Sequence, residues 1–110
     1  MQPGNIVVII VGIICIWIGC LNRKGNLSMI HSYHYKRVSE EDRVPFGKQI
    51  GLGMMMIGGA MIFAGGLMIP ADLYDVSALR IASTAVMIAG LVLGLFFAVR
   101  AMLKYNKGIF

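Results

Sequence analysis

The segment Gln49–Ala71, QIGLGMMMIGGAMIFAGGLMIPA, contains no charged residue. Two other long segments share this property, Met1–Asn22 and Ile81–Val99. Soluble domains carry about 25% charged residues, whereas this chain of 110 residues carries 14% and is 58% hydrophobic. A helix of about 20 apolar residues is long enough to cross the hydrocarbon core of a bilayer. The sequence therefore predicts a single membrane domain with three spans.

The predicted fold is an all-α, integral membrane three-helix bundle, because a backbone in lipid must satisfy its own hydrogen bonds. We expect spans at about residues 4–21, 49–70 and 79–101, a polar loop at 22–48 and a short loop at 71–78. Pro70 predicts the end of the second span, and Ser77 is a suitable N-cap for the third. Ser39-Glu-Glu-Asp42 matches a capping box ahead of Pro45, which predicts a short turn or a kink before the second span.

The positive charges predict an orientation. The loop at 22–48 holds six Lys or Arg residues, and the chain from Arg100 onwards holds three. The region of the short loop holds only Arg80, and the N-terminal segment holds none. Because cytoplasmic segments carry an excess of Lys and Arg, we expect the polar loop and the C-terminus in the cytoplasm and the N-terminus outside.

Small residues recur at helical spacing in every span, and these are the candidate packing residues. They are Gly12 and Gly19 in the first span, Gly51, Gly58 and Gly65 in the second, and Gly90, Gly94 and Ala98 in the third. Residues seven apart lie nearly on one helical face, and small residues let helices approach closely in lipid. These stripes either pack the three helices of one chain or leave one stripe for a partner or a second copy. Gly59 and Gly66 each follow a glycine of the main stripe of the second span by one residue, so they lie on a neighbouring face of the helix.

The loop between the first two spans contains the only polar and aromatic cluster. The candidate recognition residues are His31, Tyr33, His34, Tyr35, Glu40, Glu41 and Asp42. His31 and His34 would share a helix face, and with one of the acids they could hold a metal ion. The alternative is that the tyrosines lie at the headgroup level and the acids cap a helix N-terminus. Because no matched third ligand is evident, we expect no metal and no cofactor.

The spans offer little chemistry. No acid, His or Lys lies in the middle of any predicted span, although ion-coupled transporters use such buried groups. The sequence contains no nucleophile–base pair, phosphate loop or paired catalytic carboxylates. Its net charge of +5 comes mostly from residues flanking the spans, which favours anionic lipid at the cytoplasmic face over nucleic acid. Cys15 and Cys20 are predicted to be small packing residues, since five positions separate them on a helix.

We therefore expect a non-enzymatic membrane protein that is accessory, regulatory or immunity-like. It would act through helix and loop contacts with a membrane-protein partner or with further copies of itself. The alternative is a subunit of a small oligomeric transporter or channel.

One stretch resembles a known family. His31-Ser-Tyr-His-Tyr-Lys-Arg-Val-Ser-Glu-Glu-Asp42, followed by Gly51-Leu-Gly53 and an apolar span, resembles small three-span membrane proteins of unknown function from Firmicutes. The arrangement is distantly similar to the SdpI type of toxin-immunity protein, although Ser32-Tyr33-His34 stands where those proteins carry Gly-Tyr-Arg. The resemblance covers about residues 26–60. It implies a multi-pass protein of the bacterial plasma membrane.

Overall fold

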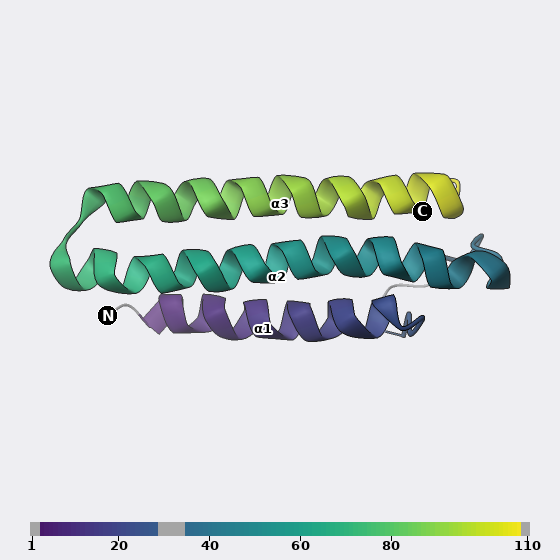
Figure 1. The fold of residues 1–110 in the computed structure, drawn as a ribbon, viewed down its shortest axis with the longest axis horizontal. Helices are drawn as coiled ribbons and strands as arrows, with labels where there is room; N and C mark the ends of the chain where they lie inside the picture. The colour runs from purple at the N-terminus through teal and green to yellow at the C-terminus, as the bar shows by residue number, and fades with distance from the viewer. Residues whose placement is uncertain (1–2, 29–34, 109–110) are drawn as a thin grey trace.

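The computed structural model describes residues 3–28 and 35–108, and within them the secondary structure is entirely helical. The elements are α1 (Pro3–Arg23), the short 3-10 helix η2 (Glu40–Asp42), α2 (Arg43–Tyr74) and α3 (Ser77–Tyr105). The three long helices run side by side along the molecule, which is 52 Å in its longest dimension (Figure 1). The predicted all-α class with three long helices is confirmed.

Each long helix is long and apolar enough to cross a membrane. Within the most apolar part of each, at most 28% of the residues are buried inside the molecule. Large apolar side chains such as Trp17, Phe63 and Phe96 are instead 57–60% exposed. Exposed apolar surface of this extent is costly in water and costs nothing in hydrocarbon. The three helices thus have the character of a multi-pass membrane protein.

The helix α2 lies between the other two (Figure 1). It contacts α1 and α3 along most of their lengths, whereas α1 and α3 hardly meet each other. The bundle is therefore built on one central helix, and the outer helices have broad uncovered faces.

Glycines bring α1 and α2 into backbone contact. A methyl group added at Gly12 would lie 2.7 Å from the carbonyl oxygen of Gly58, and one added at Gly58 would lie 2.5 Å from that of Gly12. Gly19 and Gly51 face each other in the same way. Further along, Gly65 faces the first turn of α1. Only glycine allows helices to approach this closely.

A second set of small residues brings α2 and α3 together. A methyl group added at Gly53 would lie 2.5 Å from the carbonyl oxygen of Gly94 and 3.5 Å from Cβ of Ala98. One turn along, Gly90 lies against Ala60. The eight predicted packing residues thus divide between the two interfaces, five at α1–α2 and three at α2–α3.

The helix α2 does not stop at Pro70, where the sequence analysis placed the end of the span. It continues to Tyr74 and is closed by Asp75, whose φ of 52° is left-handed and whose N–H donates to the carbonyl oxygen of Ala71. Proline removes one backbone donor, and lipid-spanning helices tolerate this loss. The extra turn places Asp72 on the helix and not in a loop.

The helix α2 begins at Arg43, six residues before the predicted start of the second span at 49, because η2 leads directly into it, and α3 continues to Tyr105, past the predicted end of the third span at 101. The hydroxyl of Ser39 accepts a hydrogen bond from the Asp42 N–H at 3.3 Å and caps η2, as the capping box predicts. Pro45 is accommodated because it lies in the first turn of α2, where an N–H has no intrahelical acceptor. Ser77 is the first residue of α3, and Val76 takes the N-cap position without a side-chain bond. Only Asp75 and Val76 connect α2 to α3, and the valine side chain has no acceptor for an N–H of the first turn of α3.

Candidate functional site

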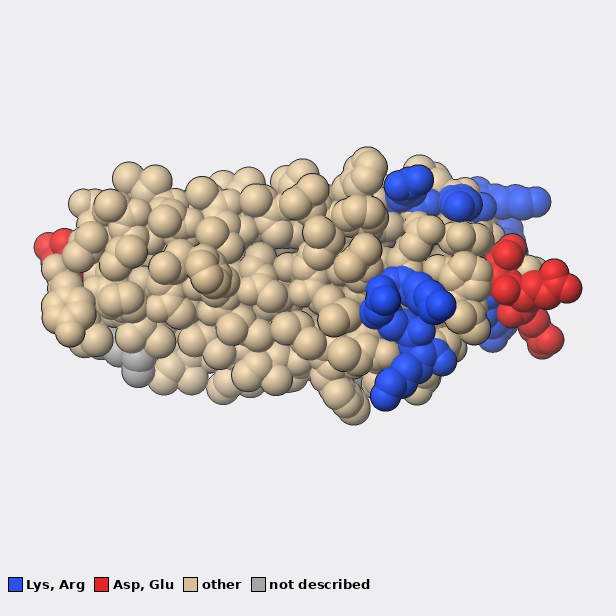
Figure 2. Space-filling view, viewed as in Figure 1, with Lys and Arg blue, Asp and Glu red and all other residues tan. Residues whose placement is uncertain are grey.

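One end of the molecule is strongly basic. Figure 2 shows Lys and Arg gathered at the end where α1 and α3 finish and α2 begins, with acidic residues at the tip beyond them. Of the ten Lys and Arg residues in the sequence, only Arg80 lies at the opposite end. The charge asymmetry predicted from the sequence is therefore also an asymmetry of the folded molecule.

A small core holds the basic end together. Phe46 and Ile50 of α2 pack with Ala101 of α3, and Leu27 and Val38 from the polar loop complete the cluster. The ring of Phe46 meets that of Tyr105 edge to face at 6.3 Å between centroids, an arrangement worth about 0.5–1.5 kcal/mol beyond burial. The described parts of the polar loop are thus packed against the helix ends.

A buried asparagine ties the loop to α3. The Asn106 side chain is 0% exposed, and its Oδ1 accepts a hydrogen bond from the Arg37 N–H at 2.7 Å. Its Nδ2 donates to the carbonyl oxygen of Gly108 at 2.9 Å. Asn106 is not among the residues predicted from the sequence, although Asn is found at some helix C-termini.

The predicted recognition cluster is only partly within the described residues. His31, Tyr33 and His34 lie outside them, so the proposed metal alternative has no geometry to assess. Tyr35 is half-buried beside the basic-end core, and the guanidinium of Arg43 lies 5.6 Å from its ring centroid. Glu40 and Glu41 are exposed, and Asp42 contributes its backbone N–H to the Ser39 cap. Within residues 3–28 and 35–108, no three His, Cys, Asp or Glu side chains gather as a metal site.

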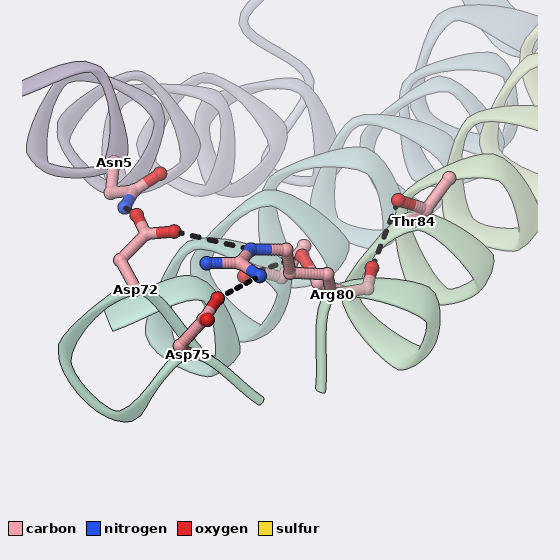
Figure 3. Close-up of polar contacts among 7 residues, drawn as sticks. Asn5, Asp72, Asp75, Arg80 and Thr84 are labelled. Atoms are coloured by element: carbon pink, nitrogen blue, oxygen red, sulfur yellow. Dashed lines mark hydrogen bonds and ion pairs between the residues drawn. The ribbon is translucent and has the colours of Figure 1, made fainter. Parts of the chain in front are cut away.

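The opposite end carries a polar cluster that joins all three long helices (Figure 3). Asn5 of α1 donates through Nδ2 to Asp72 of α2 at 2.8 Å. The other carboxylate oxygen of Asp72 lies 3.5 Å from Nε of Arg80 on α3. Arg80 also reaches Asp75 at 2.9 Å. The Asp72 side chain is 14% exposed and that of Asp75 is 89% exposed, so Asp72 is the protected member at the centre of the cluster.

A buried hydrogen bond lies one turn further along α3. The Ser83 hydroxyl donates to the carbonyl oxygen of Ala64 on α2 at 2.8 Å. Beside it is a cavity of about 70 Å³, lined by Asn5, Val8, Ala64, Gly65, Met68, Ser83 and Met87. A space of this size holds a few water molecules at most. It offers no room for a larger solute.

One flank of α2 is covered by neither α1 nor α3. Methyl groups added at Gly59 or Gly66 would meet nothing within 4 Å. Leu52, Phe63 and Leu73 are 37%, 60% and 59% exposed. Because positions seven apart share a face, Leu52, Gly59, Gly66 and Leu73 form one line along the helix. We call these four residues together with Phe63 the open flank of α2.

The chain matches no protein-family model, and searches of curated proteins and of solved structures find no match to it.

Proposed function

We propose that this chain is a non-enzymatic protein of the bacterial plasma membrane that acts by binding another membrane protein through the open flank of α2. The N-terminus is outside and the basic end is in the cytoplasm. Its role is accessory, regulatory or immunity-like, and the polar loop contributes the specificity of the contact.

The open flank carries this proposal. Gly51, Gly58 and Gly65 show how α2 uses glycines seven residues apart to bring another helix into backbone contact. Gly59 and Gly66 repeat that spacing on a face where the chain supplies no helix. Lipid gives no hydrophobic drive for helix association, so bare glycine backbone is a strong determinant of contact.

The proposed orientation is supported by the distribution of cations. All Lys and Arg residues except Arg80 lie at the basic end, and Arg80 is paired with Asp72 and Asp75. The end that carries nine of the ten Lys and Arg residues is the cytoplasmic side under the positive-inside rule.

Site-specific photo-crosslinking in native membranes tests the proposal. A photoreactive phenylalanine analogue placed at Phe63 in the open flank is expected to give one discrete protein adduct. The same analogue at Phe96 is the matched control, because Phe96 is 57% exposed against 60% for Phe63 but lies on α3. At Phe96 we expect lipid adducts only.

Substitution in the flank sharpens the test. Gly66→Leu is expected to lower the Phe63 adduct about tenfold, which corresponds to ~1.4 kcal/mol of lost contact. Ala89→Leu adds similar bulk at an exposed position of α3 and is expected to leave the adduct unchanged. Equal protein adducts from Phe63 and Phe96 would contradict the proposal. So would solute-specific flux from the purified chain in liposomes, which would favour the transporter alternative.

A further inference from the structure

The face of α3 that points away from α2 carries a groove near the basic end. It has a volume of about 600 Å³ and is lined by Leu95, Phe96, Val99, Arg100, Leu103 and Lys104. Gly90, Gly94 and Ala101, which lie on the other side of α3, are the residues that meet α2 or the basic-end core. The groove therefore opens to the surroundings of the molecule and not to its interior.

The lining of the groove is apolar along most of its length and positively charged at one end. Four apolar side chains form most of it, and the two cations Arg100 and Lys104 lie one helical turn apart toward the C-terminal end. Among the described residues, no acidic side chain forms an ion pair with Arg100 or Lys104. The Nζ of Lys104 lies 5.1 Å from the Tyr105 ring, and both Arg100 and Lys104 are exposed. An anion at this place would meet uncompensated positive charge.

The position of the groove along α3 matches the edge of the hydrocarbon core of a bilayer. Arg80 and Arg100 are about 30 Å apart on a helix that rises 1.5 Å per residue, which equals the thickness of the hydrocarbon core. Arg100 is therefore at the boundary between hydrocarbon and headgroups. The groove straddles this boundary, since Leu95 lies about 7.5 Å from Arg100 on the hydrocarbon side and Lys104 lies about 6 Å from it on the headgroup side.

We infer that this groove binds one anionic phospholipid. Its phosphate lies between Arg100 and Lys104, and an acyl chain follows Leu95, Phe96 and Val99 toward the bilayer centre. A zwitterionic lipid brings its own ammonium group to the same place, so it gains less from the two cations. The basic flanks of the spans predict a general preference for anionic lipid, and this proposal assigns that preference to one site on α3. The site is separate from the open flank of α2.

Tryptophan quenching by brominated lipid tests the site directly. The chain has one tryptophan, Trp17 on α1, which is 59% exposed. A Trp17→Phe, Phe96→Trp protein places the reporter in the groove, and the unaltered chain reports on lipid around α1 at the same end. The vesicles mix phosphatidylglycerol with phosphatidylcholine, and one of the two lipids is brominated at a time. Per lipid, brominated phosphatidylglycerol is expected to quench the groove reporter about 30-fold more effectively than brominated phosphatidylcholine. That factor is what two cations give at about 1 kcal/mol each. The reporter on α1 is expected to show a much smaller preference.

Charge variants separate a site from a general surface effect. In the groove reporter, Arg100→Gln with Lys104→Gln is expected to abolish the preference for phosphatidylglycerol. Lys24→Gln with Lys36→Gln removes the same charge from exposed positions outside the groove and is expected to preserve it. An equal loss in both double variants would overturn the site and leave only a diffuse potential. Equal quenching by the two brominated lipids in the groove reporter would also overturn it, as would competition by soluble glycerol phosphate.

Discussion

Replacing Gly58 by leucine is expected to separate α1 from α2 and to lower the free energy of unfolding by about 3 kcal/mol, the upper end of the usual cost of overpacking. The added side chain would meet the carbonyl oxygen of Gly12 at 2.5 Å. Because that atom belongs to a helix backbone, it cannot rotate out of the way as a side chain could. Thermal unfolding in mild detergent, followed by the fluorescence of Trp17 on α1, measures the loss.

The neighbouring residue provides the matched control. A methyl group at Gly59 meets nothing within 4 Å, so Gly59→Leu is expected to leave the stability of the single chain nearly unchanged. The same substitution is expected to weaken the photo-crosslink from the open flank. If Gly58→Leu and Gly59→Leu destabilised the purified chain equally, the assignment of the two glycine stripes to different contacts would be wrong.

Replacing Asp72 by alanine is expected to release the ends of α1 and α3 from α2. The substitution removes the acceptor of Asn5 and one of the two carboxylates that hold Arg80. We expect a loss of about 1–3 kcal/mol, the cost of leaving sheltered polar groups without partners. Unfolding in mild detergent measures this loss, and faster proteolysis near residues 72–80 is expected to accompany it.

Asp75 serves as the comparison for Asp72 because it pairs with the same arginine from an exposed position. Asp75→Asn removes the charge and keeps a residue type that accepts the left-handed backbone at this position. Since exposed ion pairs contribute between 0 and about 1 kcal/mol, its effect is expected to be small. A larger loss from Asp75→Asn than from Asp72→Ala would show that the charge of the turn, and not the three-helix cluster, stabilises this end.

The helical class and the three long helices could be predicted because they depend on local properties of the sequence. An uncharged segment such as Gln49–Ala71 is expected to lie in lipid, where its backbone can satisfy its own hydrogen bonds only as a helix. The glycine spacing likewise follows from helical geometry. It indicated which residues allow close approach, although it did not say which helix each stripe meets. That division, with Gly51 toward α1 and Gly53 toward α3, depends on the arrangement of whole helices.

The polar cluster at the Asp72 end could not be predicted because it depends on where α2 stops. A span that ends at Pro70 places both Asp72 and Asp75 in the loop at 71–78. One further helical turn makes them different, since it turns Asp72 toward Asn5 and leaves Asp75 exposed. Nor does spacing within the sequence bring Asn5 and Asp72 together, because their contact requires α1 to pack against α2.

The basic end shows the same distinction. The sequence indicated Ser39 as a cap, which is a local hydrogen bond within four residues. The packing of Leu27 in the cluster of Phe46, and the hydrogen bond of Arg37 with Asn106, join segments that are distant in the chain. These contacts hold the described part of the polar loop against α2 and α3.

Labelling of single cysteines with a membrane-impermeant maleimide on intact cells tests the central claim that three helices cross the membrane with the basic end inside. The background carries Cys15→Ala and Cys20→Ala, which removes both native thiols. Ser39 and Ser77 are exposed and lie at opposite ends of the molecule. The account predicts that Ser77→Cys is labelled on intact cells and that Ser39→Cys is labelled only after permeabilisation. Labelling of both on intact cells, or of Ser39→Cys alone, would contradict it.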